Sequence, residues 1–115
     1  MEDRDELHIG NIIDFCDGIK TAISELGITR ESFDKSATQR AVLAFFVEHI
    51  GEEASKLSKN FVKSNPEIEW KAVVNFRHRI VHAYISIDPD VLWDTIQNDI
   101  PELYHFCSTK LQHAN

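Results

Sequence analysis

The chain has little of what builds turns: four glycines and three prolines in 115 residues. Because turns depend heavily on these two residues, their scarcity favours few, long elements. No apolar run approaches the length of a membrane span. Residues 1–6 are acidic and have no apolar stretch behind them, which is not the pattern of a signal peptide. The sequence therefore predicts a single domain over residues 1–115, cytoplasmic and without membrane association.

Cysteine is equally scarce. Cys16 and Cys107 lie near opposite ends of the chain and form neither a CxxC pair nor a metal-binding pattern. A disulfide framework is therefore excluded as the basis of the fold. We expect both thiols to be buried, reduced and structural.

Positive charge is scarce as well. The chain holds 12 Lys and Arg against 19 Asp and Glu, a net charge of -7, and its pI is about 5.2. This balance argues against a general nucleic-acid coat, because affinity for nucleic acid comes largely from contacts with phosphates. One stretch departs from it: residues 71–84 contain Lys71, Arg77 and Arg79 but no Asp or Glu. Any contact with RNA is therefore expected on this basic island, or on a surface shared with a partner chain.

Apolar residues recur at spacings of three and four throughout the chain, as in amphipathic helices. The pattern predicts four main helices, at about residues 5–26, 36–61, 69–83 and 90–111, with a polar connection at 29–36. No strand alternation and no repeat is present. The predicted fold class is all-α, an up-and-down bundle of four main helices.

Local signals refine these boundaries. Gly27 is placed to cap the first helix, and Asp88 followed by Pro89 is a typical start for the last one. Pro101 is expected to kink or break that last helix. Gly51 lies inside the second pattern. It indicates either close approach of another backbone or an exposed face that tolerates glycine.

The basic island carries the chemistry: Arg77, His78, Arg79, His82 and Tyr84 fall within little more than two helical turns. Imidazole is the side chain best suited to move protons near neutral pH. Guanidinium is the best suited to grip a phosphate. On an ideal helix, residues five apart are separated by about 7.5 Å along the axis and about 140° around it. Arg77 and His82 therefore reach one phosphate only if the arginine leans back, unless a second copy of the helix completes the site.

Three other interpretations of the same residues stay open on spacing alone. His78 and His82 are one turn apart and could bind a metal, although no carboxylate or cysteine lies close to them in the sequence. The histidines and arginines could form a solvated polar face. Tyr84 could fill the core, with its hydroxyl at the surface.

The pattern Arg77-x4-His82-Ala83-Tyr84 resembles the R-x4-H-x-Y signature of HepT-like toxins in the HEPN superfamily. His78 fills the polar position that follows the arginine in HEPN motifs. The similarity extends over nearly the whole chain, in Gly51-Glu52-Glu53-Ala54, Trp70, Asp88 with Val91 and Trp93, and Asp99-Ile100-Pro101-Glu102-Leu103.

This resemblance implies a HEPN-like bundle and a bacterial ribonuclease toxin that needs no metal or other cofactor. Arg77 and His82 would be catalytic, with His78 and Arg79 supporting phosphate binding. Such toxins are typically homodimers whose motif helices face each other across a shared cleft. Their usual partner is an MntA-like nucleotidyltransferase antitoxin. In the characterised pair the antitoxin transfers AMP to the motif tyrosine, which would be Tyr84 here.

Two other functions compete with a ribonuclease toxin. The chain could be a non-catalytic HEPN module that binds nucleotide or RNA beside a minimal nucleotidyltransferase, or a plain helical interaction protein. The complete set of Arg77, His82 and Tyr84 favours the enzyme, whereas the net charge of -7 is unusual for a protein that cleaves RNA.

Overall fold

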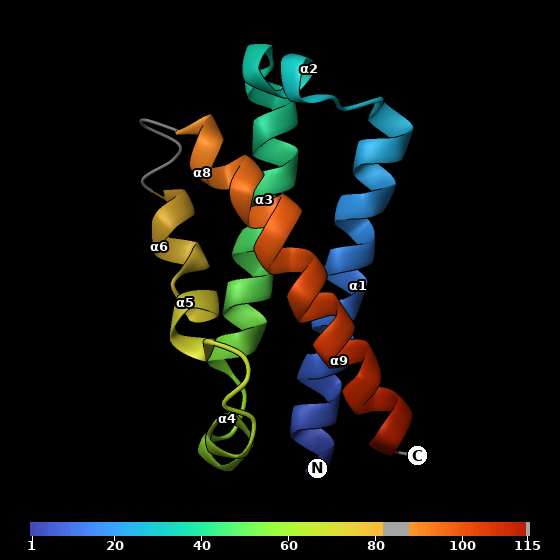
Figure 1. Cartoon of the computed structure of the whole chain (residues 1–115), viewed down its shortest axis with the longest axis vertical. Coiled ribbons are helices and arrows are strands. Elements are labelled where there is room, and N and C mark those ends of the chain that lie inside the picture. The colour runs from blue at the N-terminus through green and yellow to red at the C-terminus, as the bar shows by residue number, and fades with distance from the viewer. Residues whose placement is uncertain (82–87, 115) are drawn as a thin grey trace.

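The computed structural model describes residues 1–81 and 88–114, and at positions 77, 80, 81 and 114 it describes the backbone only. Every regular element in this part of the chain is helical, which confirms the all-α fold class. The long columns of an up-and-down bundle are α1 (Asp3–Leu26), α3 (Ala37–Ser55) and a composite last helix of α8 (Pro89–Asp94), η1 (Thr95–Asp99) and α9 (Ile100–Ala114). Figure 1 shows α5 (Trp70–Val74) and α6 (Phe76–Val81) beside α3, on the side away from α1. Within the described residues, no helix is long and apolar enough to cross a membrane.

The predicted end of the first helix is confirmed, whereas the prediction of a polar connection at residues 29–36 is wrong. Gly27 caps α1 in the left-handed conformation, at φ 60°, where a side chain would be strained. Residues 29–36, predicted to be a connection, contain a short helix, α2 (Arg30–Lys35). Thr29 accepts a hydrogen bond from the Ser32 amide, and the Ser32 hydroxyl accepts one from the Thr29 amide. This serine version of the capping box starts a helix within a stretch that has no apolar periodicity.

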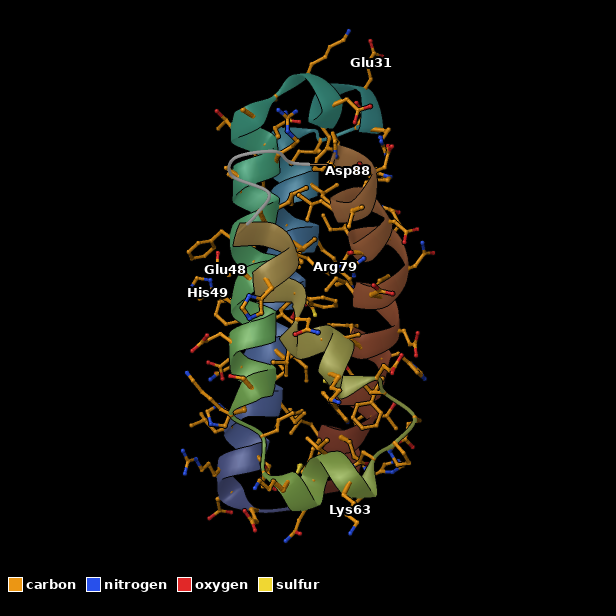
Figure 2. The ribbon with its side chains drawn as sticks, turned by 90° about the vertical axis from the view of Figure 1, so that its left-hand side faces the viewer. Glu31, Glu48, His49, Lys63, Arg79 and Asp88 are labelled. Carbon is orange, nitrogen blue, oxygen red and sulfur yellow. The ribbon has the colours of Figure 1, made fainter. Side chains whose placement is uncertain are left out.

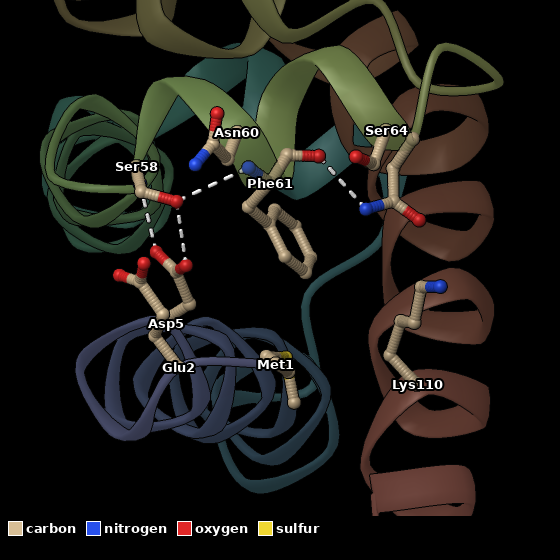
Figure 3. A pocket seen from close by; sticks show the side chains of 9 residues that line it. Met1, Glu2, Asp5, Ser58, Asn60, Phe61, Ser64 and Lys110 are labelled. Carbon is tan, nitrogen blue, oxygen red and sulfur yellow. Dashed lines mark hydrogen bonds between the residues drawn. The ribbon is translucent and has the colours of Figure 1, made fainter.

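The second predicted helix, 36–61, is also wrong in its last part. α3 ends at Ser55, and a separate helix, α4 (Lys59–Ser64), begins after Ser58. The buried carboxylate of Asp5 accepts hydrogen bonds of 2.7 Å from both the amide and the hydroxyl of Ser58, and the Ser58 Oγ accepts one from the Phe61 amide (Figure 3). A side chain from α1 therefore fixes the start of α4, a long-range contact that periodicity cannot reveal.

The third predicted helix is broken at Asn75 into α5 and α6, and its last residues, 82 and 83, lie outside the described part. The last helix begins as predicted, because the Asp88 side chain accepts from the Asp90 amide and Pro89 occupies the first turn. The irregularity expected near Pro101 is the π-helical turn η1. It ends at Asp99, directly before α9, and α9 continues through the proline. Proline has no N–H to donate to the preceding turn, so the helix adjusts upstream of it rather than ending there.

The core lies between α1, α3 and the last helix, and two glycines bear on how closely these elements approach. Gly51 is buried in α3, so the alternative of an exposed, tolerated glycine is wrong. At Gly18 on α1, a Cβ atom would lie 2.6 Å from Cε1 of Phe46 on α3. This contact between α1 and α3 therefore depends on a glycine that had no predicted role.

Candidate functional site

The motif lies on α6 and on the residues that follow it. Arg77 is on α6, although its side chain is not described, and His78 and Arg79 are exposed on the same helix. His82 and Tyr84 lie outside the described residues. The convergence of Arg77 with His82, and the accessibility of Tyr84, therefore stay predictions.

The start of the motif segment is held by buried aromatic and polar contacts. Trp70 donates its indole N–H to the carbonyl of Asn65 at 2.9 Å, and the side-chain Nδ2 of Asn65 donates to the Phe61 carbonyl at 2.8 Å. The Trp70 ring contacts Phe61 and Phe106 edge-on, at centroid distances of 5.8 Å and 5.6 Å. Phe76, the first residue of α6, is 2% exposed. Trp70, one of the family-like residues, thus fixes the chain just ahead of Arg77.

The other end of the motif segment is held at α8. Trp93 packs against Phe33 of α2 at 5.0 Å between ring centroids, and Arg30 lies over the Trp93 ring at 5.8 Å. Arg30 also forms an ion pair with Asp90. Hydrogen bonds to Asp90, and then to Asp34, raise the pKa of Arg30 above its ordinary value. Of the family-like residues after the motif, Asp88 caps the start of α8 and Trp93 anchors α8 to α2.

Gly51-Glu52-Glu53-Ala54 contributes a polar link between α3 and α1. His8 Nδ1 and Glu53 Oε2 are 2.6 Å apart, Asn11 donates to the same oxygen at 3.1 Å, and the Lys56 ammonium is 3.6 Å from Oε1. Burial alone would raise the pKa of Glu53, but the hydrogen bonds from His8 and Asn11 and the charge of Lys56 outweigh it, and the pKa is lowered. The family-like stretch around Gly51 therefore links α3 to α1 through the contacts of Glu53.

Beside the motif helix the surface is acidic. A groove of about 380 Å³ runs between α5 and α6 on one side and the last helix on the other, with an apolar floor that includes Phe76 and Leu103. Four carboxylates line it: Glu67, Glu69, Asp99 and Glu102. Figure 2 shows Arg79 reaching from α6 toward the last helix. An acidic groove therefore lies along one edge of the basic island.

The metal-site alternative concerns His78 on α6 and His82, and the described residues bear on it as follows. Among them, no group of three or more His, Cys, Asp or Glu side chains could hold a metal ion. The alternative of a His78–His82 metal pair depends on His82, which lies outside the described part.

Comparison with known protein families gives a match to the model described as ribonuclease HepT-like, over residues 9–109. The chain belongs to this family. The match places it in the HEPN superfamily and overlaps every helix described here. It agrees with the resemblance drawn from the motif around Arg77 and from the flanking residues.

Individual relatives cover shorter stretches. A protein of Thermococcus cleftensis named as a probable ribonuclease HepT is 39% identical over 66 residues, 57% of this chain and 59% of the relative. A protein of Caldanaerobacter subterraneus subsp. tengcongensis, provisionally named an RNase, is 31% identical over 77 residues, 67% of this chain and 69% of the relative. A provisionally named RNase of Methanocaldococcus jannaschii is 33% identical over 64 residues, 56% of this chain and 52% of the relative. The chain thus spans between about half and two thirds of the length of these relatives. No solved structure matches it.

The carboxylates that line the groove beside α6 had no predicted role. Glu67 and Glu69 precede α5, whereas Asp99 and Glu102 lie on the last helix, so helical spacing carries no signal that they line one groove. Only the packing of the last helix beside α5 and α6 brings them together.

Proposed function

We propose that this protein is a metal-independent ribonuclease toxin built as one HEPN domain, in which Arg77 and His82 are the catalytic residues. The observation that carries the proposal is family membership over residues 9–109, together with an intact Arg77-x4-His82-x-Tyr84 motif. In support, buried contacts at Trp70 and aromatic contacts at Trp93 hold the chain on both sides of the motif. Fixed flanks are what a site needs to hold its side chains in a reactive geometry.

RNA supplies its own nucleophile, so the enzyme needs few groups. One imidazole, from His82, removes the proton from the 2′-hydroxyl as its oxygen attacks the adjacent phosphorus. The bond from phosphorus to the 5′-oxygen breaks, and that oxygen receives a proton from an acid, a role that water can fill. Arg77 stabilises the charge that develops on the phosphate oxygens. The products are a 2′,3′-cyclic phosphate and a free 5′-hydroxyl, and no metal is required.

His78 and Arg79 have supporting roles in this proposal. His78 is exposed on α6 next to Arg77 and can donate a hydrogen bond to a phosphate oxygen. Arg79 is exposed too, but it faces the last helix. In this proposal Arg79 supports phosphate binding from the side of α6 that faces the last helix.

The proposed function also implies partners for this chain. RNA is the substrate, a second copy of the chain completes the cleft, and an MntA-like nucleotidyltransferase is the antitoxin. Transfer of AMP to Tyr84 would place a bulky anion two residues past His82. That anion can pair with Arg77, occupy the position of the substrate phosphate and repel RNA.

The test is RNA cleavage by the purified chain with excess chelator, beside His82→Ala and Arg77→Ala. We expect cleavage to survive chelation, and each variant to lose nearly all activity. Because the two residues act on one phosphate, the double variant should be no worse than either single one. Activity that disappears with chelator would instead favour the His78–His82 metal pair.

One observation favours a second function. With a net charge of -7 and carboxylates lining the groove beside α6, the chain is poorly suited to general attraction of RNA. A non-catalytic HEPN module that binds nucleotide or RNA beside a nucleotidyltransferase is the alternative. Folded wild type that binds AMP or RNA but cleaves no RNA, with or without Mg²⁺, would establish it.

A further inference from the structure

Charge is divided unevenly along the chain. Residues 54–81 hold six of the 12 Lys and Arg residues but two of the 19 Asp and Glu residues, so this segment is net positive and the rest of the chain carries the negative charge. The segment folds into α4, α5 and α6, which follow one another along one side of the bundle (Figure 1). We call these three helices the basic edge. The basic island is therefore one part of a longer positive surface.

The part of the basic edge farthest from the motif is α4, which presents lysines to solvent. Lys59 and Lys63 are exposed and lie one helical turn apart, so they share one face of α4. In Figure 2, where the basic edge faces the viewer, Lys63 points away from the bundle at one end of the long axis, and Arg79 lies further up. Neither Lys59 nor Lys63 forms an ion pair with another described residue, whereas Lys56 lies 3.6 Å from Glu53. Two cations on α4 are therefore available to an anion from outside the chain.

Contacts on its inner side hold α4 in place. The buried carboxylate of Asp5 accepts hydrogen bonds from the amide and the hydroxyl of Ser58 at the start of the helix (Figure 3). Phe61 is 7% exposed, and Asn65 donates to its carbonyl and accepts from the indole of Trp70 on α5. A surface that is already ordered loses less conformational freedom when it binds a partner. The lysine face of α4 is therefore held in a fixed position relative to α5.

The outer face of α4 has the chemistry of a surface for a phosphate backbone. Its exposed residues are Lys59, Asn60, Lys63 and Ser64. Ammonium, amide and hydroxyl groups are typical donors to phosphate and sugar oxygens, and such contacts carry no sequence information. None of the exposed residues of α4 is aromatic, so this helix offers no platform on which a base could stack. The face is therefore suited to gripping a nucleic-acid backbone without reading its sequence.

Carboxylates border the basic edge on two sides. Glu2 and Asp5 line a hollow of about 320 Å³ on the inner side of α4, where it meets the start of α1 (Figure 3). Glu67 and Glu69, the two acids of the segment, line the acidic groove that faces the last helix. Both places repel phosphates. The outer faces of α4, α5 and α6 are therefore the path that remains for a polyanion.

We propose that α4 binds the phosphate backbone of RNA through Lys59 and Lys63, and that the RNA runs from there along the basic edge to the motif on α6. The role in cleavage rests on the ribonuclease function proposed above, whereas the binding can be measured on a chain that does not cleave. The molecule is 42 Å long, and α4 lies at one end of it (Figure 1). Only an RNA of several nucleotides can therefore reach both α4 and the motif. This surface gives a chain of net charge -7 the local attraction for RNA that its composition lacks.

The first test is RNA binding by Lys59→Gln/Lys63→Gln, made in a His82→Ala background so that the RNA stays intact. The probe is a fluorescently labelled single-stranded RNA of about 16 nucleotides, followed by anisotropy. The matched control is Lys20→Gln/Lys35→Gln, which removes the same charge from exposed lysines on α1 and α2. We expect the α4 variant to lose about tenfold or more in affinity at about 50 mM salt, and the control to stay within about twofold of the parent.

The salt dependence separates direct contact with phosphates from a general effect of charge. Each phosphate contact on a single strand contributes about 0.7 to the slope of log K against log salt concentration, so the α4 variant should lose about 1.4 of that slope. The control should keep the slope of the parent. Uridine-rich and adenine-rich RNA should respond alike, because no base is read on α4. Unchanged affinity and slope in the α4 variant would overturn the proposal.

The second test is cleavage, with Lys59→Gln/Lys63→Gln placed in the wild-type chain. For the same RNA we expect KM to rise about fivefold or more while kcat stays within about twofold, because a contact far from the reacting phosphate stabilises ground state and transition state equally. A dinucleotide that fills the motif cannot reach α4, so its cleavage should be unchanged. An equal loss with the dinucleotide would show that the substitution disturbs the motif itself, and would overturn the proposal.

The outcomes distinguish this proposal from the proposed function. A wild-type chain that binds RNA through α4 and cleaves none would keep the binding surface and reject the ribonuclease function alone. Cleavage of the long RNA that is unaffected by the α4 substitutions would keep the ribonuclease and reject the surface. Polyglutamate is the competing probe, because an acidic protein could occupy the same lysines. If it binds as tightly as RNA at equal salt, and loses as much affinity in the α4 variant, the surface belongs to an acidic protein and the assignment to RNA is overturned.

Discussion

At the scale of single residues, His8 and Glu53 show how a polar pair can hold two helices together. Their side chains are 10% and 13% exposed, and Nδ1 lies 2.6 Å from Oε2. A hydrogen bond to a charged partner in such surroundings contributes about 1.5–3 kcal/mol. Glu53 belongs to the family-like stretch around Gly51, and its partner His8 lies 45 positions away in the sequence.

Glu53→Gln should lower the free energy of unfolding at pH 7 by about 2 kcal/mol, because the charged acceptor of two hydrogen bonds is lost. The pKa of Glu53 is lowered from its ordinary value of 4.5 in the folded protein. Its contribution is therefore complete above that pH and is lost as the pH falls through the lowered folded value. Urea titrations of wild type and variant should converge in acid. Glu25→Gln, an exposed change on the same α1 helix that His8 occupies, is the control. A constant difference between wild type and Glu53→Gln at every pH would contradict this account.

The two cysteines make a second prediction at this scale. Both are free and fully buried. Burial, with a smaller contribution from Asp17, raises the pKa of Cys16 to about 12, and burial raises that of Cys107 as well. Because the thiolate is the reactive form, a thiol reagent at pH 8 should leave native protein unmodified and label both residues in urea. Labelling of either thiol in the native protein faster than global unfolding would show that the helices open locally at α1 and α9.

At the scale of elements, the contact between α1 and α3 makes two glycines of the same helix behave in opposite ways. A Cβ at Gly18 would meet the Phe46 ring at 2.6 Å, whereas a Cβ at Gly10 meets nothing within 4 Å. Gly18→Ala should lower the free energy of unfolding by about 1–3 kcal/mol through overpacking. Gly10→Ala should raise it by up to about 1 kcal/mol through helix propensity.

Thermal or urea denaturation of the two variants gives the comparison directly. Gly18→Ala combined with Phe46→Leu should recover part of the loss of Gly18→Ala relative to Phe46→Leu alone, because the smaller side chain makes room for the new methyl group. If Gly18→Ala stabilises the protein as Gly10→Ala does, the close approach of α1 and α3 is not a constraint on the fold.

The elements also show what sequence can and cannot give. Helices with continuous apolar spacing, and the caps at Gly27 and Asp88, were predictable because both signals are local. The separate helix α4 was not, because its start depends on Asp5, 53 positions before Ser58. The break at Asn75 was missed for the converse reason: the apolar spacing continues across it. For the site, the motif at Arg77 could be recognised, but the acidic groove beside α6 depends on the packing of two distant parts of the chain.

At the scale of the whole molecule, the negative net charge of the chain works against RNA binding at its basic island. A chain of net charge -7 carries a basic island on α5 and α6 with an acidic groove along one edge. One island is a weak attractor for RNA, whereas two islands facing each other across a two-fold axis would concentrate cations in one place. A second copy therefore offers what the single chain lacks, in agreement with the wide angle expected between Arg77 and His82 on one helix.

Mixing two inactive variants tests this shared site. If each cleft takes Arg77 from one chain and His82 from the other, a heterodimer of Arg77→Ala with His82→Ala has one intact site and one that lacks both groups. Random exchange makes half of the dimers heterodimers, so co-refolded protein should recover about a quarter of wild-type activity. Light scattering at micromolar concentration should show a dimer for both variants and for the mixture. Mixing Arg77→Ala with itself is the control and should recover nothing. A dimer whose mixture stays inactive would place Arg77 and His82 of one chain in the same site, and the arginine would then have to lean back along its own helix to reach the phosphate.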